Sequence, residues 1–241
     1  MTARASGVLL PIFSLPGDYG CGTMGRYADA FLDFLSDSGQ KYWQILPLVP
    51  IGAGHSPYMS PSAFGGNPYF IDPEALVAAG WLTAEELAAT VCTARDRVDY
   101  DYLEQVRMPL LRLAWLRAKG ENLPELAAFR RAEAHWLAGY CAFVAADAQA
   151  ADEGEFCAFL QWLFFTQWQK LRMYAHGKNI RIIGDLPIYV SPVGADVAQH
   201  PELFLRDEAG NFAAVAGVPP DAFTALGQLW GNPLYDWEGN R

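Results

Sequence analysis

Arg26–Val49 reads RYADAFLDFLSDSGQKYWQILPLV, and this stretch decides the fold because a helical pattern passes directly into a short apolar run. Apolar residues recur at helical spacing as far as Ser38, and Gly39 stands where a helix commonly ends. The residues expected on the shared face of this helix are Tyr27, Phe31, Phe34 and Leu35. Tyr42–Val49 (YWQILPLV) is continuously apolar, which predicts a buried strand.

Two further apolar runs extend this pattern into a parallel sheet. Upstream, Gly7–Phe13 (GVLLPIF) predicts another buried strand, so strand, helix and strand follow one another as a βαβ unit. Such a unit implies parallel pairing and a right-handed crossover. Downstream, Ile180–Val190 (IRIIGDLPIYV) predicts the third strand.

The segment between the second and third strands is predicted to be helical. Asp72 and Pro73 suit the start of a short helix that Gly80 ends. The run from Thr83 to Glu86 is a capping box that opens another helix. From about Tyr102 to Gly177 the chain is rich in alanine, leucine and aromatic residues. Its breaks near Gly120–Pro124 and Asp152–Gly154 predict three helices.

These elements predict an α/β protein, specifically part of a (β/α)8 barrel with an inserted helical subdomain. A complete barrel needs eight parallel strands, whereas only three are found here. We expect barrel strands one and two with a polar loop in residues 1–72, the helical insertion in 73–178, and strand three with a cleft-covering loop in 179–241. Ser191–Arg241 is expected to be loop-like, and the chain is expected to end before the rest of the barrel.

Composition excludes several classes of partner. The formal net charge is −10 and no lysine or arginine cluster offsets it, so binding to nucleic acid or to an anionic membrane is not expected. Cys21, Cys92, Cys141 and Cys157 are scattered and read as free thiols. The N-terminus lacks the features of a signal peptide, and no apolar run is long enough to span a bilayer. We therefore expect a soluble cytoplasmic protein, whose oligomeric state the sequence does not fix.

Gly20–Gly25 (GCGTMG) matches the G-x-G-x-x-G pattern of dinucleotide-binding loops, but its setting argues against that function. Pro16 separates the first glycine from the preceding strand, and the second strand ends in Leu46-Pro47-Leu48 without an acidic residue for a ribose hydroxyl. We interpret the segment as a loop whose glycines let the backbone turn. The four histidines are too far apart to predict a metal site.

In a parallel α/β barrel, the C-terminal ends of the strands and the loops after them form the active face. Three segments of this chain occupy that position. Gly52–Asn67 offers hydroxyl and amide groups beside an aromatic ring, which suits a sugar but also suits an ordinary polar loop. Asp185 either pairs with an arginine or caps a loop, or else it points into a site. Val215–Trp237 carries Asp221, Gln228, Trp230 and Asn232, and it is either ligand-facing or a tryptophan-anchored structural loop.

Together the motifs resemble the 4-α-glucanotransferase (amylomaltase) family, in the order that the family has them. The matching segments are SLPGDYGCGTMG (Ser14–Gly25), YWQILPL (Tyr42–Leu48), HSPYMSPSAFGGNPYFID (His55–Asp72), GDLPIYV (Gly184–Val190) and GVPPDAFTALGQLWGNPLYDW (Gly217–Trp237). The last of these is the most specific. The likeness weakens through the helices from about Leu87 to Asn179.

The resemblance implies a barrel related to α-amylase that transfers α-1,4-linked glucan segments without a cofactor. Ser56 and Tyr58 would then lie on the glucan-binding surface, and Asp185 would help to bind the sugar beside the scissile bond. Four residues would belong to a mobile loop over the cleft: Asp221, Gln228, Trp230 and Asn232. Pro233 would hold the exit of that loop.

The chain departs from the family pattern at His55, Met59, Thr23 and Ala222. The family's retaining mechanism would need a nucleophile and an acid/base that lie on later strands. Nothing in the chain matches those motifs, so we assign no catalytic residue and expect this chain alone to be inactive. Its expected partner is a malto-oligosaccharide or α-1,4-glucan, which places it in starch, glycogen or maltose metabolism. The alternatives are a non-catalytic glucan-binding module and an inactive fragment.

Overall fold

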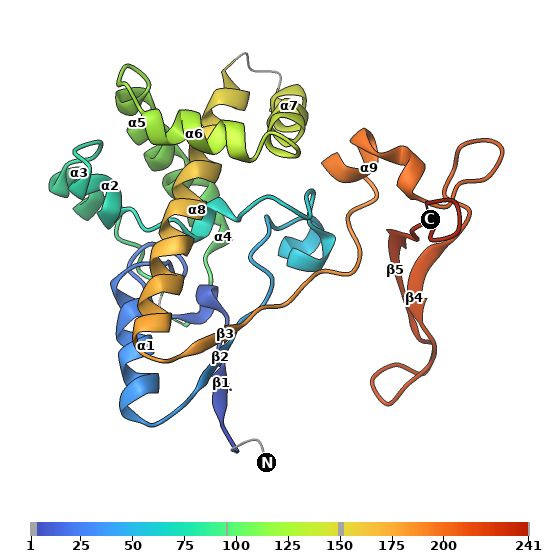
Figure 1. Ribbon diagram of the computed structural model, residues 1–241, viewed down its shortest axis with the longest axis horizontal. Helices are drawn as coiled ribbons and strands as arrows, with labels where there is room; N and C mark the ends of the chain where they lie inside the picture. Colours follow the sequence, from blue (N-terminus) through green and yellow to red (C-terminus); the bar gives the residue numbers. More distant parts are fainter. Residues whose placement is uncertain (1–3, 95, 149–151, 241) are drawn as a thin grey trace.

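The computed structural model describes residues 4–94, 96–148 and 152–240. Its centre is a three-stranded parallel sheet of β1 (Gly7–Leu9), β2 (Tyr42–Gln44) and β3 (Arg181–Ile183), with β2 in the middle (Figure 1). The three strands pair in register without a shift, and both pairings are parallel. The prediction of three parallel strands is therefore confirmed.

Each strand is shorter than its apolar run predicted. A proline follows each strand within a few residues: Pro11 after β1, Pro47 after β2 and Pro187 after β3. Because proline cannot donate a backbone hydrogen bond, the ladder does not extend through it. The residues after β3, which we expected inside a strand, form an extended loop instead.

The sheet is covered on one face only. Val8, Trp43 and Ile182 lie side by side and face the core, and Trp43 is fully buried, with its indole N–H donating to the Leu10 carbonyl at 2.7 Å. On the opposite face Leu9 is 54% exposed and Ile183 is 44% exposed. The expectation that these strands are buried is thus wrong for one of their two faces.

Helix α1 (Arg26–Asp37) connects β1 to β2 and packs on the covered face. It ends where predicted, and Gly39 adopts the left-handed conformation there (φ +73°). Its buried residues are Ala28, Leu32 and Leu35, whereas Phe34, expected on the same face, is 59% exposed. The helical period was predicted correctly, but the buried face is rotated from the one we expected.

After the polar loop with its short 3-10 turns, eight helical elements of the described chain lie between Asp72 and β3. They are α2 (Glu74–Ala78), α3 (Ala84–Ala88), α4 (Tyr100–Tyr102), a π-helical turn (Leu103–Arg107), α5 (Met108–Ala118), α6 (Pro124–Ala132), α7 (Leu137–Ala148) and α8 (Glu153–Gly177). Three helices were expected from about residue 102 onward, but a turn at residues 133–136 divides the middle one into α6 and α7.

The helix ends follow the predicted capping. The Asp72 carboxylate accepts a hydrogen bond from the Glu74 backbone N–H at 3.3 Å, and Gly80 has φ +80° after α2. At α3 both bonds of the capping box are present: Glu86 N–H donates to Thr83, and Thr83 N–H donates to the Glu86 carboxylate. These local signals were read correctly because each depends on a few neighbouring residues.

Helix α8 ties the polar loop after β2 to the sheet. It packs on α1 and leads directly into β3. The buried Gln161 side chain accepts from Gly66 N–H at 2.7 Å and donates to the Gly66 carbonyl at 3.0 Å. Gln167 forms the same pair of bonds with the backbone of Asp72, at 2.7 and 3.2 Å. One continuous core includes residues of the sheet, α1, α5 and α8.

The C-terminal segment is more regular than expected. After α9 (Ala195–Gln199), β4 (Val215–Val218) and β5 (Gln228–Pro233) pair as an antiparallel hairpin. The prediction of a loop-like segment is wrong here, because its prolines and glycines obscured two short strands. Figure 1 shows the hairpin on the far side of the molecule from α1, reached by the extended chain that follows β3.

A candidate carbohydrate-binding cleft

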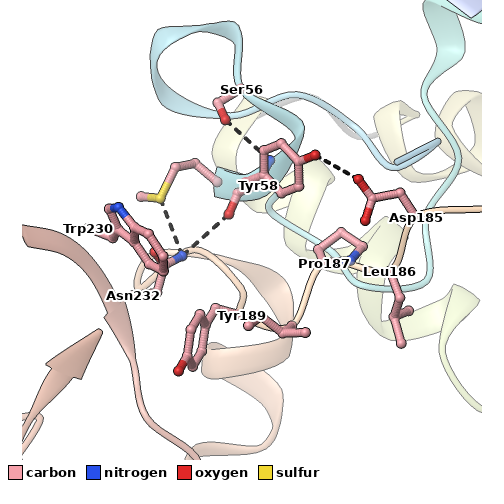
Figure 2. Close-up of a pocket in the computed structure, with 10 residues that line it drawn as sticks. Ser56, Tyr58, Asp185, Leu186, Pro187, Tyr189, Trp230 and Asn232 are labelled. Atoms are coloured by element: carbon pink, nitrogen blue, oxygen red, sulfur yellow. Dashed lines mark hydrogen bonds between the residues drawn. The ribbon is translucent and has the colours of Figure 1, made fainter. Parts of the chain in front are cut away.

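The three polar segments singled out in the sequence meet in one cleft. It has a volume of about 610 Å³ and lies between the loop after β2, the loop after β3 and strand β5 (Figure 2). The residues that line it are Ser56, Tyr58, Met59, Asp185, Leu186, Pro187, Ile188, Tyr189, Trp230 and Asn232. Five of the seven predicted site residues are in this group.

Tyr58 and Asp185 form the polar centre of the cleft. The Tyr58 hydroxyl donates to Asp185 Oδ2 at 2.6 Å, and Figure 2 shows the two side chains pointing toward each other. This hydrogen bond to the carboxylate, followed by partial burial, raises the pKa of Tyr58 to about 12. The tyrosine therefore keeps its proton at neutral pH. Asp185 therefore points into the cleft, as one of its predicted alternatives had it, and its hydrogen-bond partner there is Tyr58.

A one-turn helix sets the position of Tyr58. Ser56 caps the 3-10 turn Pro57–Met59, with its hydroxyl accepting from the Tyr58 backbone N–H at 3.2 Å. Proline at the first position of the turn fixes its backbone without the loss of a hydrogen bond. Ser56 thus lines the cleft and also shapes the loop that presents Tyr58.

Asn232 joins the three walls of the cleft. It is 4% exposed, and its amide Nδ2 lies 2.9 Å from the Val190 carbonyl, 3.3 Å from Met59 Sδ and 3.4 Å from the Tyr58 carbonyl. These contacts connect β5 with the loops after β2 and β3. The donor of this side chain is therefore directed at protein atoms of the cleft walls.

Asp221 and Gln228 are outside the cleft lining. Asp221 is exposed at the end of the hairpin, where its carboxylate accepts from the backbone N–H groups of Phe223 and Thr224 at 2.8 and 2.9 Å. Gln228 accepts from the Trp230 indole N–H at 3.1 Å, so it orients the ring that does line the cleft. Trp230 itself is 45% exposed.

Four lining residues escaped the sequence analysis: Leu186, Pro187, Ile188 and Tyr189. We had placed them inside the third strand, as buried apolar residues. Leu186 is 79% exposed and Ile188 is 68% exposed, and they form an apolar wall beside Asp185. Pro187 was the available signal, because a barrel strand pairs on both sides and a proline within it cannot donate to the ladder.

Two departures from the family pattern lie at the cleft: Met59 is part of its lining, and His55 directly precedes the lining residue Ser56. His55 has φ +56° and stacks on Tyr100, with ring centroids 3.8 Å apart and an interplanar angle of 6°. Met59 accepts the contact from Asn232 described above. Both side chains therefore contact neighbouring protein groups at the edge of the predicted site.

Within residues 4–94, 96–148 and 152–240, no group of three or more histidine, cysteine or acidic side chains could hold a metal ion. All four cysteines are buried free thiols, as predicted. None of the helices in the same part of the chain combines the length and apolar character that crossing a bilayer requires.

Comparisons with known proteins identify the family. A family model described as 4-alpha-glucanotransferase matches residues 10–154 and 142–241. Among curated relatives, the 4-alpha-glucanotransferase of Thermus thermophilus is 44% identical over 98% of this chain, and that of Streptococcus pneumoniae is 40% identical over 99%. The chain spans about half the length of these relatives, 52% and 53% respectively.

The solved structures agree with the sequence comparison. An amylomaltase from Streptococcus agalactiae, determined in complex with acarbose, has 37% identity and a TM-score of 0.92 over 99% of this chain and 54% of its own. An amylomaltase from Corynebacterium glutamicum, with 21% identity and a TM-score of 0.73, shares the fold over 96% of this chain. The predicted fold class, a partial (β/α)8 barrel, is therefore confirmed, and this chain belongs to the 4-alpha-glucanotransferase family.

Proposed function

We propose that this chain is the N-terminal part of an enzyme that transfers α-1,4-glucan segments between malto-oligosaccharides, and that its own share is substrate-binding surface. The observation that carries the proposal is the shared cleft. Tyr58, Asp185 and Trp230 come from three segments far apart in the sequence, and they line the same 610 Å³ space.

The chemistry of the cleft suits a neutral sugar chain. A glucose unit has apolar C–H faces and a rim of hydroxyl groups, so it needs flat apolar surfaces beside hydrogen-bonding groups. Trp230 and Tyr189 supply aromatic rings, Ile188 adds an aliphatic surface, and Tyr58 and Asp185 supply the polar groups. The acarbose bound to the Streptococcus agalactiae amylomaltase supports an oligosaccharide ligand for this chain as well.

Each predicted residue has a role in the proposal. Asp185 and Tyr58 bind the sugar beside the scissile bond, with Ser56 shaping that surface. Trp230 packs on a sugar face from the hairpin, and Asn232 keeps the hairpin against the loops. Asp221 and Gln228 belong to the hairpin and act through it, since neither lines the cleft.

The chemical step is assigned to groups outside this chain. A retaining transfer needs two acidic groups about 5–5.5 Å apart, one to attack the anomeric carbon and one to act as acid and then base. Among the described residues, Asp185 is the carboxylate in the cleft lining. We therefore propose that the chain alone is inactive. We also propose that it uses no cofactor and that it acts in the cytoplasm.

Tryptophan fluorescence tests the binding proposal directly. Titration of the chain with maltoheptaose should give a saturable change, and Trp230→Ala should weaken binding by about tenfold or more, the value of an aromatic contact of about 1.5 kcal/mol. Trp237→Ala is the matched control, because Trp237 is 74% exposed on the same segment but does not line the cleft. Equal affinity in both variants would contradict the proposed site.

A stand-alone glucan-binding module is the second candidate, because the cleft is formed within this chain. The two functions differ when the remaining half of a relative is supplied. Maltotriose disproportionation that appears only after this chain is mixed with, or fused to, such a half supports the enzyme. Binding without any such complementation supports the module. Disproportionation by this chain alone would contradict the absence of catalytic acids.

A further inference from the structure

Two of the four buried thiols lie on neighbouring helices that pack against each other. Cys141 lies on α7 and Cys157 lies on α8, and both belong to the second hydrophobic cluster of the molecule. Their exposed fractions are 7% and 5%. Cys157 follows Gly154 by three residues on the same face of α8, and Gly154 packs against the backbone of Cys141.

Small residues bring the two helices close together at this point. A Cβ atom placed on Gly154 of α8 would lie 3.4 Å from the Cys141 carbonyl oxygen and 3.7 Å from the Ala145 Cβ atom of α7. A methyl group at Gly154 would thus already be in van der Waals contact with α7, so the two helices lie close together here. A disulfide requires Cα atoms about 4.4–6.8 Å apart, a separation that only closely packed helices provide.

A small molecule can reach one of the two thiols. Cys141 lines a cavity of about 350 Å³ between α6, α7 and α8. Most of its lining is alanine and glycine, and it also includes Arg130 and Glu155, whose ion pair has an N–O distance of 2.6 Å. Cys157 is not part of this lining, so the two thiols differ in access.

We propose that Cys141 and Cys157 are an oxidation site that forms a reversible disulfide between α7 and α8. A two-electron thiol oxidant such as diamide accepts the two electrons that the thiols lose. The Cys141 thiolate adds to the N=N bond of the oxidant, and the Cys157 sulfur then displaces the reduced nitrogen group. One S–S bond forms, and the two thiol hydrogens end on the two nitrogen atoms of the hydrazine product.

The remaining cysteines are separate from this pair. Cys21 donates to the Tyr69 carbonyl at 3.4 Å, and Cys92 lies 3.9 Å from Asp99 Oδ2. The hydrogen bond with Cys141, then burial, raises the pKa of Cys157. Because the thiolate is the reactive form, the reaction should accelerate as pH rises above neutral.

The bond would stabilise the packing of α7 on α8. Closing a loop of this length restricts the unfolded chain, which should raise the melting temperature of a domain this size by roughly 6–12 °C. Helix α7 also packs on α9, which follows the loop after β3. The inference does not depend on glucan binding, so its failure and that of the proposed function are separable.

The test uses the whole chain, fully reduced and then treated with diamide. Alkylation and non-reducing peptide mapping should show Cys141 linked to Cys157, with Cys21 and Cys92 alkylated. The melting temperature should rise and return to its starting value after dithiothreitol. Cys141→Ser and Cys157→Ser should each abolish the linked peptide, whereas Cys21→Ser should retain it.

Two results would overturn the proposal. One is recovery of Cys141 and Cys157 as alkylated thiols after the chain has been treated to completion with excess diamide at pH 9. The other is a linked peptide that contains Cys21 or Cys92 in their place. Mapping of the unsubstituted chain decides between these results even if a serine variant does not fold.

Discussion

At the scale of single residues, the cleft depends on side chains that contact each other more than on isolated ligand groups. Tyr58 is held by Asp185, Trp230 is held by Gln228, and Asn232 contacts both loops. A substitution at one position therefore acts on its partner as well, and double variants should be less than additive.

Tyr58→Phe removes the hydroxyl that orients Asp185 and leaves the ring in place. We expect maltoheptaose affinity to fall roughly three- to tenfold, as the loss of about 0.5–1.5 kcal/mol for one hydrogen bond implies. Tyr174→Phe is a matched control, because that hydroxyl donates to the carboxylate of Asp33 at 2.8 Å away from the cleft. Fluorescence titration of both variants makes the comparison, and equal losses would refute the orienting role.

Asn232→Ala should lower stability as well as affinity. It leaves the Val190 carbonyl without its donor in a buried position, at a cost of about 1–3 kcal/mol. Urea unfolding measures this cost, with the exposed Asn122→Ala as control. Loss of affinity at unchanged stability would show that Asn232 is a ligand contact and not a positioning residue.

Much of the cleft could be predicted from residue types and their order. Tyr58, Asp185 and Trp230 follow predicted strands or sit in a specific motif, and they do meet in the structure. The apolar wall at Leu186 and Ile188 could not be predicted, because an apolar run reads as a buried strand whether or not another layer covers it.

At the scale of elements, α8 positions the loop after β2 through two glutamine side chains, whose amides form hydrogen bonds with the backbone of the loop. Gln161 and Gln167 each offer one donor and one acceptor to an extended segment, in the way that a neighbouring strand would. This contact could not be predicted from spacing, since the glutamines and their partners are 95 residues apart in the sequence.

Gln161→Ala should destabilise the chain by about 2–4 kcal/mol, because it leaves a buried N–H and a buried carbonyl of Gly66 unpaired. Gln169→Ala, on an exposed position of the same helix, controls for helix propensity. Chemical denaturation of both variants provides the measurement. A similar small change in the two would show that water replaces the glutamine without cost.

The capping box of α3 should give the chain a component of acid sensitivity. Hydrogen bonds from Arg117, then from the Thr83 backbone, lower the pKa of Glu86 from 4.5 to about 2. A carboxyl with a depressed pKa in the folded state stabilises it above the unfolded pKa, and this contribution is lost as pH falls from 4.5 toward 2.

Glu86→Gln should therefore flatten the loss of stability across that pH range, with little further change at neutral pH beyond the loss of the ion pair. Melting temperatures between pH 2 and 7 report the effect. Glu85→Gln, one position earlier in the same first turn, is the control. Parallel pH profiles of the two variants and the parent chain would exclude the assigned role of Glu86.

At the scale of the whole molecule, an apolar surface runs from the uncovered face of the sheet along the loop after β3. Its most exposed members include Leu9, Ile183, Leu186, Ile188 and Val193. The family relatives are about twice as long as this chain, and the further strands of a complete barrel would enclose the sheet-face part of this surface, at Leu9 and Ile183. In this chain, the surface is an association hazard.

Leu186→Lys should lower self-association of the chain without lowering its melting temperature, because the side chain is 79% exposed. Sedimentation velocity over a range of concentrations measures the association. Leu116→Lys, at a residue 54% exposed on α5, places the same charge on the opposite part of the molecule. An equal effect at Leu116 would mean that net charge, and not this surface, controls association.

The pairing of β2 with β3 also governs how the chain reaches its native state. When the third strand pairs with the second, it closes a loop that contains all the residues between Gln44 and Arg181. Closing so large a loop is entropically slow, and contacts this distant in sequence are typical of proteins that fold late and slowly. During synthesis, the helices can therefore collapse around Trp43 while the third strand is still inside the ribosome, and the edge of the nascent sheet needs protection until β3 emerges.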